Sequence, residues 1–324
     1  MRRAASPVVL CLRALGLGDL LTGLPALRAL GDAFPEHHRV LATPLELAPL
    51  ALHAGVAHRV VPVRGLAPLP PMAPPEVAVD LHGRGPESHR NLLALNPRRL
   101  IAFANAAAGW GPAPEWRADE HEVVRWCRLL EESGIPADPS RLEITAPEIA
   151  VPEQAAGATL LHPGAASPSR RWPVERWVDV ARAEDAAGGQ VIVTGAASER
   201  GQALAVARRA GLDDAAVLAG KTTALELAAV VGAAARVVSG DTGVGHLATA
   251  LRTPSVLLFG PSSPAHWGPP PDRARHIVLW AGRRGDPHAS TADPGLMAIS
   301  SAEVIGALDA LRSELTLASK GGEE

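Results

Sequence analysis

The stretch VVSGDTGVGHLATA, residues 237–250, joins an apolar run typical of a buried strand to a helix through a glycine-rich turn. Asp241 and Thr242 lie in that turn, and His246 follows one turn into the helix. Glycines let a backbone approach a ligand closely, and the N–H groups at a helix start attract anions. Asp241, Thr242 and His246 are therefore candidates to bind phosphate and sugar hydroxyls. The alternative is that Asp241 caps the helix and His246 is buried.

The same change from an apolar run to a helical pattern recurs along the chain, which is typical of parallel α/β structure. Strands are expected over 7–14, 38–44, 58–63, 76–83, 158–165, 189–196, 215–220, 236–240 and 255–260. Helices are expected over 18–34, 117–135, 174–188, 199–211, 223–235, 243–252 and 300–315, where Ser300 and Glu303 fit a capping box. A proline-rich segment, 136–157, separates two doubly wound halves. The predicted domains are 1–150 and 151–324.

Composition limits the classes of function. The chain has 324 residues, 47% hydrophobic and 20% charged, with a net charge of −3, so no basic field for nucleic acid is expected. The start is basic and then apolar, like a secretion signal, but Arg13 and Asp19 interrupt the apolar run, which favours a strand. Cys11 and Cys127 have neither disulfide nor zinc spacing. A cytoplasmic protein is expected, with peripheral contact to a membrane left open.

Several motif matches fail, and the failures narrow the chemistry. Gly16 and Gly18 begin a dinucleotide fingerprint, but Leu21 stands where its third glycine would be. LAGKTT, residues 218–223, lacks the first glycine of a P-loop because Ala215 stands there. Neither DxD, HExxH, CxxC nor GxSxG occurs in the sequence, which disfavours metal-centred transferases and zinc or serine hydrolases. Asp19 either caps the helix after the first strand or acts as a general base.

A basic loop follows the first strand of the second half. HPGAASPSRRWP, residues 162–173, begins with His162 and Gly164, continues through Ser167, and ends with Arg170 and Arg171 before a tryptophan and a proline. Two arginines among glycine and serine at a strand end are typical of a phosphate or diphosphate site, because guanidinium groups donate paired hydrogen bonds. A solvated basic loop is the alternative. The segment 259–270 follows a later strand and is expected to close the pocket wall.

The order of these motifs resembles the glycosyltransferase family that includes the ADP-heptose:lipopolysaccharide heptosyltransferases. The resemblance covers roughly residues 8–312 and rests on 15–30, 160–177, 191–203, 218–231 and 237–269. It implies the GT-B architecture, in which two Rossmann-like domains face a central cleft. It also implies that the first domain binds the acceptor, that the second binds an ADP-linked sugar, and that the last helix packs back on the first domain. Family members look inverting and metal-independent, so neither a cofactor nor a metal ligand is predicted.

The resemblance also assigns roles to individual residues. Asp19 becomes the general base, and Arg170 stands where the family commonly has a lysine that contacts phosphate. The remaining donor-site candidates are His162, Gly164, Ser167, Arg171, Thr194, Gly195, Lys221, Thr222, Glu226 (uncertain by one position), Asp241, Thr242, Gly243 and His246. On the acceptor side, Gly18, His82, Arg84 and Arg90 are candidates, although a solvated loop explains 80–90 equally well.

The function expected from this reading is metal-independent, inverting transfer of heptose or a related sugar to a glycan or glycolipid. Two alternatives stay open. One is a non-catalytic nucleotide-sugar-binding protein, which would bind nucleotide without transfer or donor hydrolysis. The other is a UDP-sugar epimerase of GT-B-like fold, which would act without an acceptor. The sequence leaves open the identity of sugar and acceptor, the nucleotide preference and the oligomeric state.

Overall fold

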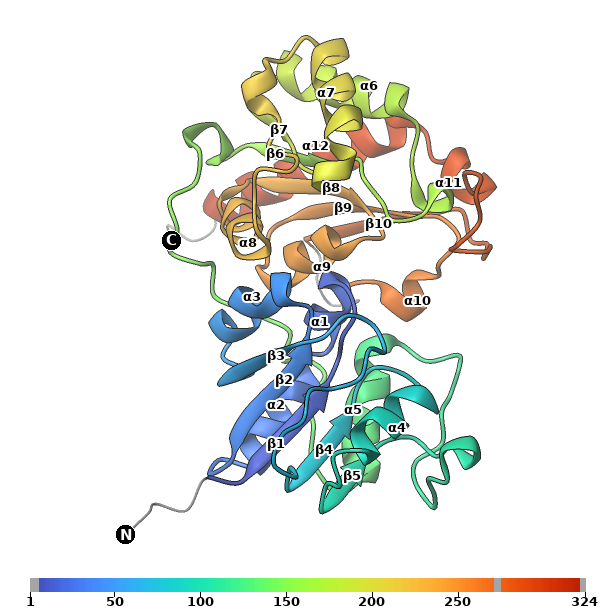
Figure 1. Ribbon diagram of the computed structural model, residues 1–324. Coiled ribbons are helices and arrows are strands. Elements are labelled where there is room, and N and C mark those ends of the chain that lie inside the picture. Colours follow the sequence, from blue (N-terminus) through green and yellow to red (C-terminus); the bar gives the residue numbers. More distant parts are fainter. Residues whose placement is uncertain (1–5, 271–274, 321–324) are drawn as a thin grey trace. The chain divides into compact units, whose positions relative to one another are not determined.

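A computed structural model describes residues 6–270 and 275–320, with side chains described to residue 313. The chain divides into two compact units, the first ending at Ile144 and the second beginning at Thr145, inside the proline-rich segment (Figure 1). Each unit holds one five-stranded sheet. All strand pairs within both sheets are parallel. The predicted α/β class with two doubly wound domains is confirmed.

The first unit has the strand order β3-β2-β1-β4-β5, which reverses direction between β1 and β4. Its strands are β1 Val8–Leu12, β2 His38–Thr43, β3 Arg59–Pro62, β4 Val77–Asp80 and β5 Arg99–Ile101. Its helices are α1 Leu17–Thr22, α2 Leu24–Ala33, α3 Ala48–His53, α4 Glu87–Leu93 and α5 Glu122–Glu132. The helix expected over 18–34 is two helices, because Gly23 ends α1 and Pro25 lies in the first turn of α2.

The second unit has the strand order β10-β9-β8-β6-β7, which reverses between β6 and β8. Its strands are β6 Thr159–His162, β7 Val191–Val193, β8 Arg236–Gly240, β9 Ser255–Phe259 and β10 His276–Trp280. Its helices are α6 Val174–Ala186, α7 Arg200–Ala210, α8 Ala224–Ala233, α9 Gly243–Ala250, α10 Pro264–Trp267, α11 Pro294–Ala298 and α12 Ser301–Lys320. The strand expected over 215–220 is only a bridge between Val217 and Val193. A short 3-10 turn, Asp214–Ala216, replaces its first part.

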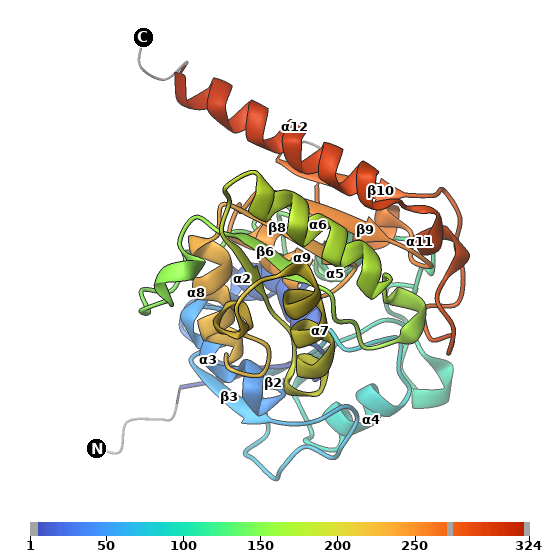
Figure 2. The same cartoon turned by 90° about the horizontal axis from the view of Figure 1, so that it is seen from above.

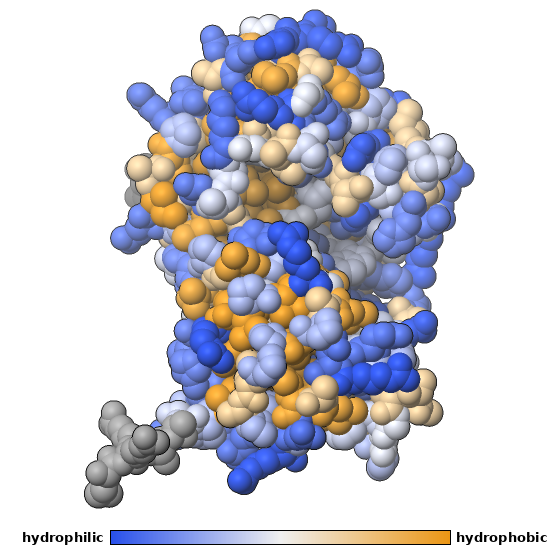
Figure 3. Space-filling model, in the orientation of Figure 1, coloured by the Kyte–Doolittle hydropathy of each residue, from blue (hydrophilic) through white to orange (hydrophobic). Residues whose placement is uncertain are grey.

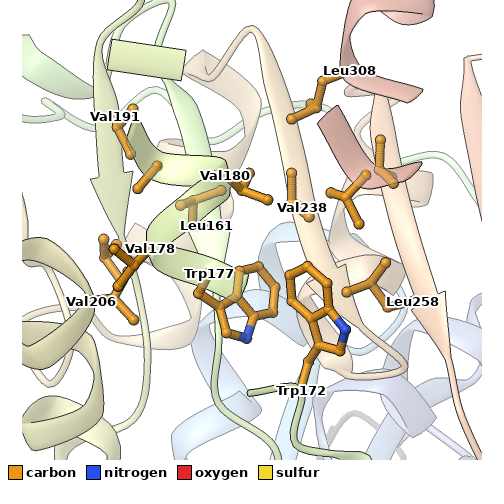
Figure 4. Packing of buried hydrophobic residues seen from close by; sticks show 14 of the residues in the cluster. Leu161, Trp172, Trp177, Val178, Val180, Val191, Val206, Val238, Leu258 and Leu308 are labelled. Carbon is orange, nitrogen blue, oxygen red and sulfur yellow. The ribbon is translucent and has the colours of Figure 1, made fainter. Parts of the chain in front are cut away.

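The core of the second unit surrounds two perpendicular tryptophan rings, Trp172 and Trp177, whose centroids are 5.2 Å apart (Figure 4). Val304, Leu308 and Leu311 of α12 are buried in the same cluster, and α12 runs beside α6 (Figure 2). These side chains of α12 thus complete the core of the second unit. A return of the last helix to the first domain stays a prediction.

The start of the chain and the start of α12 follow the sequence patterns. The first apolar run forms β1, which pairs with β2 and β4, while residues 1–5 lie outside the described residues. The capping box of α12 is present, since the Ser300 N–H donates to Glu303 Oε2 at 2.8 Å. No described helix combines the length and the apolar character that crossing a membrane requires.

Candidate functional site

In an open α/β sheet, ligands bind beyond the carboxyl ends of the strands, where the strand order reverses. In the second unit this place lies between β6 and β8. The loop after β6 carries His162 to Arg171, and the turn after β8 carries Asp241 and Thr242. The two stretches that the sequence singled out therefore end at one edge of one sheet.

A direct contact joins these two loops. The Arg170 guanidinium donates from Nη1 to the Asp241 carbonyl oxygen at 3.4 Å. Its Nε is buried and has no hydrogen-bond partner among the described residues. The loops also pack directly, since a Cβ built on Gly240 would lie in ordinary van der Waals contact with the Arg170 carbonyl oxygen, at 3.5 Å. A half-buried guanidinium with a spare donor, held at a strand end, is suited to bind an anion.

The start of α9 is a second anion-binding feature. Thr242 is the N-cap of α9, but its side chain accepts no N–H from the helix. The Thr242 hydroxyl is instead 2.8 Å from the Ser239 hydroxyl. The first N–H groups of α9, beginning at Gly243, are therefore not capped by that side chain and can donate to an oxyanion.

A small pocket adjoins the start of α9. Its lining includes Asp241, Thr242, His246, Trp267 and Pro269. The rings of His246 and Trp267 meet edge to face with centroids 6.1 Å apart. Phe259, Trp267 and Pro269 of the segment 259–270 thus form part of the wall of this small pocket, while closure of a donor pocket by that segment stays a prediction.

His162 faces the neighbouring strand rather than the loop arginines. It is buried, and its Nδ1 is 3.0 Å from the Thr194 hydroxyl at the end of β7. Burial lowers the pKa of His162 to about 4, and the nearby Glu199 carboxylate opposes this only in part. His162 is therefore neutral at neutral pH, and it ties the ends of β6 and β7 together.

Glu199 is a residue that sequence reasoning missed. Its carboxylate accepts the Ala196 N–H at 2.7 Å and lies over Gly164 and Gly195. A Cβ at Gly164 would lie 2.2 Å from the Glu199 carboxyl group, so only glycine fits there without a shift. The sequence carried only half of a capping box here, since Glu199 stands three residues after Ala196, whose side chain has no acceptor.

Two residues of the basic loop hold the loop itself. The Ser167 hydroxyl is 3.0 Å from the Ser169 hydroxyl and donates to the Ala289 carbonyl at 3.2 Å. Arg171 is exposed and donates from Nε to the Ala165 carbonyl at 2.9 Å. These contacts fix the loop that presents Arg170.

Lys221, Thr222 and Glu226 follow the bridge at Val217, beside β7 rather than at the reversal point. Lys221 is exposed and Thr222 is half-buried. Glu226 forms a capping box at the start of α8, because its carboxylate accepts the Thr223 N–H at 2.7 Å. That backbone hydrogen bond, with one to the Thr223 side chain, lowers the pKa of Glu226. Capping accounts for its position, and a ribose contact stays a prediction.

In the first unit, Asp19 lies just beyond the end of β1, beside the reversal point between β1 and β4. Gly18 precedes it in the first turn of α1. Asp19 Oδ2 accepts the Gly16 N–H at 3.1 Å, while 27% of its side chain is exposed. The capping alternative is therefore realised, and the carboxylate still reaches solvent.

Arg13 organises this edge of the sheet and was not identified from the sequence. It is 1% exposed, and it donates hydrogen bonds to the carbonyl oxygens of Asp19 and Leu81. It also reaches the Thr22 hydroxyl at 3.0 Å and Glu122 Oε1 at 3.2 Å. One buried cation thus joins the turn that carries Asp19 to the loop that follows β4.

The acceptor-side candidates have different environments. The Ala14 N–H donates to His82 Nδ1 at 3.2 Å, so His82 lies between the ends of β1 and β4. Arg90 is exposed and donates to the Ala107 carbonyl at 2.6 Å. Arg84 has an exposed side chain, and its carbonyl accepts from Asn105 at 2.8 Å. Of these three, only His82 is brought close to Asp19, whose charge influences its pKa.

Known proteins resemble this chain in the region that holds the loops after β6 and β8. A family model described as glycosyltransferase family 9 (heptosyltransferase) matches residues 113–292. Lipopolysaccharide heptosyltransferase 2 of Salmonella typhimurium is 32% identical over 160 residues, which are 47% of this chain and 46% of that protein. Lipopolysaccharide heptosyltransferase 1 of Pseudomonas aeruginosa is 39% identical over 101 residues, 31% of this chain and 28% of that protein. The match therefore spans less than half the length of either relative.

Solved structures share the fold over nearly the whole chain. The glycosyl transferase family 9 structure from Veillonella parvula has a TM-score of 0.79 at 20% identity and covers 96% of this chain and 99% of that one. The ADP-heptose lps heptosyltransferase II of E. coli has a TM-score of 0.74 at 18% identity, with coverage of 95% and 99%. At these identities the likeness concerns the fold alone, and the predicted two-domain GT-B fold is confirmed.

Proposed function

The chain belongs to glycosyltransferase family 9, the heptosyltransferase family, and on that premise we propose that it transfers a sugar from an ADP-linked donor. The sugar is heptose or a related one, and the acceptor is a hydroxyl group of a glycan or glycolipid. The observation that carries the proposal is the contact between Arg170 and the Asp241 turn, inside the matched region, next to the uncapped start of α9.

On the donor side, negative charge develops on the diphosphate as its bond to the sugar breaks. The guanidinium of Arg170 and the first N–H groups of α9 are suited to stabilise that charge, since both are fixed before the reaction starts. In this proposal they supply the stabilisation without a metal ion. Within the described residues, no group of three or more His, Cys, Asp or Glu side chains is arranged to hold a metal. Metal independence is part of the proposal and predicts that ADP binding persists in the presence of a chelator.

On the acceptor side, Asp19 acts as the general base. The acceptor oxygen forms a bond to the anomeric carbon while the bond from that carbon to the diphosphate oxygen breaks. The hydroxyl proton passes to the Asp19 carboxylate, and the electron pair of the broken bond leaves with ADP. The part-exposed carboxylate and the fixed backbone around it suit this role.

We test the enzyme proposal with ADP-heptose as donor and with lipopolysaccharide that lacks its heptoses as acceptor. Asp19→Asn keeps the size of the side chain, and transfer should fall by about 10²–10⁴-fold while ADP affinity is unchanged. The exposed Glu36→Gln of the same unit serves as the matched control and should retain the activity of the parent protein. Intact transfer in Asp19→Asn would refute the assignment of the base.

The proposal includes a cytoplasmic location with peripheral contact to a membrane that carries the acceptor. Leu45 and Leu66 follow β2 and β3 and are 63% and 43% exposed, and Leu52 of α3 is 46% exposed. Figure 3 shows apolar residues on the face of the first unit that carries α3. Co-flotation with anionic vesicles should weaken in Leu45→Ser, whereas an unchanged floating fraction would count against this contact.

A further inference from the structure

A buried acid and a buried histidine meet behind the loop that carries His82. Asp80 ends β4 and His89 lies in α4, and both side chains have no exposed area. His89 Nδ1 is 2.8 Å from Asp80 Oδ2. On the other side of the ring, Nε2 is 2.7 Å from the Phe103 carbonyl oxygen. Neither residue was a site candidate from the sequence.

Three groups lie at the nitrogens of the His89 ring: the Phe103 carbonyl oxygen at Nε2, and at Nδ1 the Asp80 carboxylate at 2.8 Å and the Ser88 hydroxyl at 3.4 Å. A carbonyl oxygen and an ionised carboxylate can only accept, and the carboxylate is the nearer group at Nδ1, so both ring nitrogens are assigned as donors. His89 is then an imidazolium paired with the Asp80 carboxylate. Burial alone would lower the pKa of His89, but the bonds to Asp80 and Phe103, with the Asp80 charge, outweigh it and raise the pKa.

The pair is connected to the candidate acceptor site through the backbone. Asp80 Oδ1 accepts the His82 N–H at 2.9 Å. The ring of His89 also lies against the turn at Gly85, where a Cβ would be 2.6 Å from Nδ1. Asp80 and His89 together therefore fix both ends of the short loop from His82 to Gly85.

His82 is neutral, whereas His89 is charged. Since the Ala14 N–H donates to His82 Nδ1, this nitrogen carries no proton and Nε2 does. Burial lowers the pKa of His82; Asp80 and Asp19 oppose this shift and Arg13 adds to it. His82 is thus a neutral ring, and in the described part of the chain Nε2 has no hydrogen-bond partner.

We propose that Asp80 and His89 are a positioning pair that holds His82 as a neutral hydrogen-bond donor for an oxygen of the acceptor. This inference rests on the proposed function, because it assigns His82 to the acceptor of that reaction. It differs from a role as a cation for an anionic acceptor, since a neutral N–H can serve an uncharged hydroxyl or ether oxygen. A buried ion pair adds little net stability over an apolar pair. The role of this pair is instead to fix the conformation of the loop from His82 to Gly85.

Histidine protonation is measured directly by long-range ¹H–¹⁵N correlation spectra of the full chain labelled with ¹⁵N-histidine. His82→Gln and His89→Gln assign the signals by their loss. At neutral pH we expect both nitrogens of His89 to be protonated and only Nε2 of His82 to be protonated. A neutral His89, a charged His82, or a proton on His82 Nδ1 would overturn the proposal.

Variants then test the coupling between the pair and His82. Asp80→Asn should remove one His89 proton signal and shift the His82 Nδ1 signal, and His89→Leu should shift the same His82 signal. His89→Gln, whose amide keeps two N–H donors, should shift it less. The exposed His58→Gln should leave it unchanged. A His82 signal that is unmoved in both Asp80→Asn and His89→Leu would refute the positioning role.

Activity separates this inference from the proposed function. Binding of ADP and slow hydrolysis of ADP-heptose by water should persist in His82→Gln and His82→Ala. Transfer to heptose-free lipopolysaccharide should fall at least tenfold in His82→Ala and less in His82→Gln, which keeps a donor. If the parent protein neither binds ADP nor hydrolyses the donor, the proposed function fails, while the histidine spectra still decide the positioning pair. Equal transfer by His82→Ala and the parent protein would exclude the donor role of His82.

Discussion

Arg13→Met is the substitution that most directly tests how the Asp19 turn is held. Met preserves an unbranched apolar stem but removes the donors to the Asp19 and Leu81 carbonyl oxygens. It also removes the bonds to Thr22 and Glu122 and the guanidinium that lies 5.1 Å from the Trp126 ring centroid. Without Arg13, the Asp19 turn loses its connection to the loop after β4.

The cost follows from the burial of Arg13. Removing one partner of a buried ion pair typically destabilises by about 3–5 kcal/mol. Glu122 keeps Arg125 and the Trp126 N–H at 2.7 Å, which places the expected cost near the lower end of that range. The carbonyl oxygens of Asp19 and Leu81 lose a charged donor, and this loss raises the expected cost. We therefore expect a loss of about 3–4 kcal/mol for Arg13→Met.

Hydrogen exchange during urea unfolding of the full chain measures this loss locally, which is necessary because a chain of two units need not unfold in one step. Peptides from α1 and α5 should lose protection in Arg13→Met, and Arg13→Lys should be intermediate. The control is Arg208→Met, since Arg208 and Asp214 pair at 2.6 Å with side chains 64% and 51% exposed. That control should change stability by less than about 1 kcal/mol. A loss under about 1 kcal/mol in Arg13→Met, with α1 still protected, would refute the reasoning.

Three further predictions concern the second unit. Gly164→Ala should lower the free energy of unfolding by about 1–2 kcal/mol, because the new Cβ displaces the Glu199 carboxylate. In urea unfolding, most of that cost should disappear when Gly164→Ala is made in a protein that already carries Glu199→Ala. An equal cost with and without Glu199 would contradict the contact. The pKa of His162 is about 4 in the folded protein and 6.5 for the free side chain, so between pH 6.5 and 4 only the unfolded state binds this proton. The free energy of unfolding should therefore fall by about 3 kcal/mol as the pH drops from 6.5 to 4. His162→Asn should flatten that part of the pH profile, and an unchanged slope would show that other groups cause it. Arg170→Met should weaken ADP binding by about 10–100-fold in calorimetry, whereas the exposed Arg182→Met should not, and equal affinities would exclude Arg170 from the site.

Most of the fold could be predicted because the strands that precede the candidate-site loops contain short apolar runs. The runs at β1, β6 and β8 are buried on both faces, which is what a central parallel strand requires. β5 is a strand of three residues at a sheet edge, too short to give a periodic signal. The run at 215–220 is apolar, but the turn capped by Asp213 leaves only Val217 paired.

The candidate site was predictable where its residues follow a strand directly. Arg170 and Asp241 are 71 positions apart in sequence, yet parallel pairing of β6 with β8 brings their loops to one edge. Arg13 and Glu122 gave no such signal, because a buried ion pair across 109 positions has no local pattern. His89 was missed for the same reason, since its partner Asp80 lies on another element.

The measurement that tests the central claim most directly is calorimetric titration of the full chain with ADP, UDP, GDP and dTDP, in buffer containing a chelator and no added metal. The account predicts that ADP binds selectively, and that Arg170→Met loses this binding while Asp19→Asn keeps it. Preference for another nucleotide would overturn the donor assignment. The absence of binding by every nucleotide would contradict the role of Arg170 and Asp241 as a diphosphate site, and with it the proposed transfer reaction.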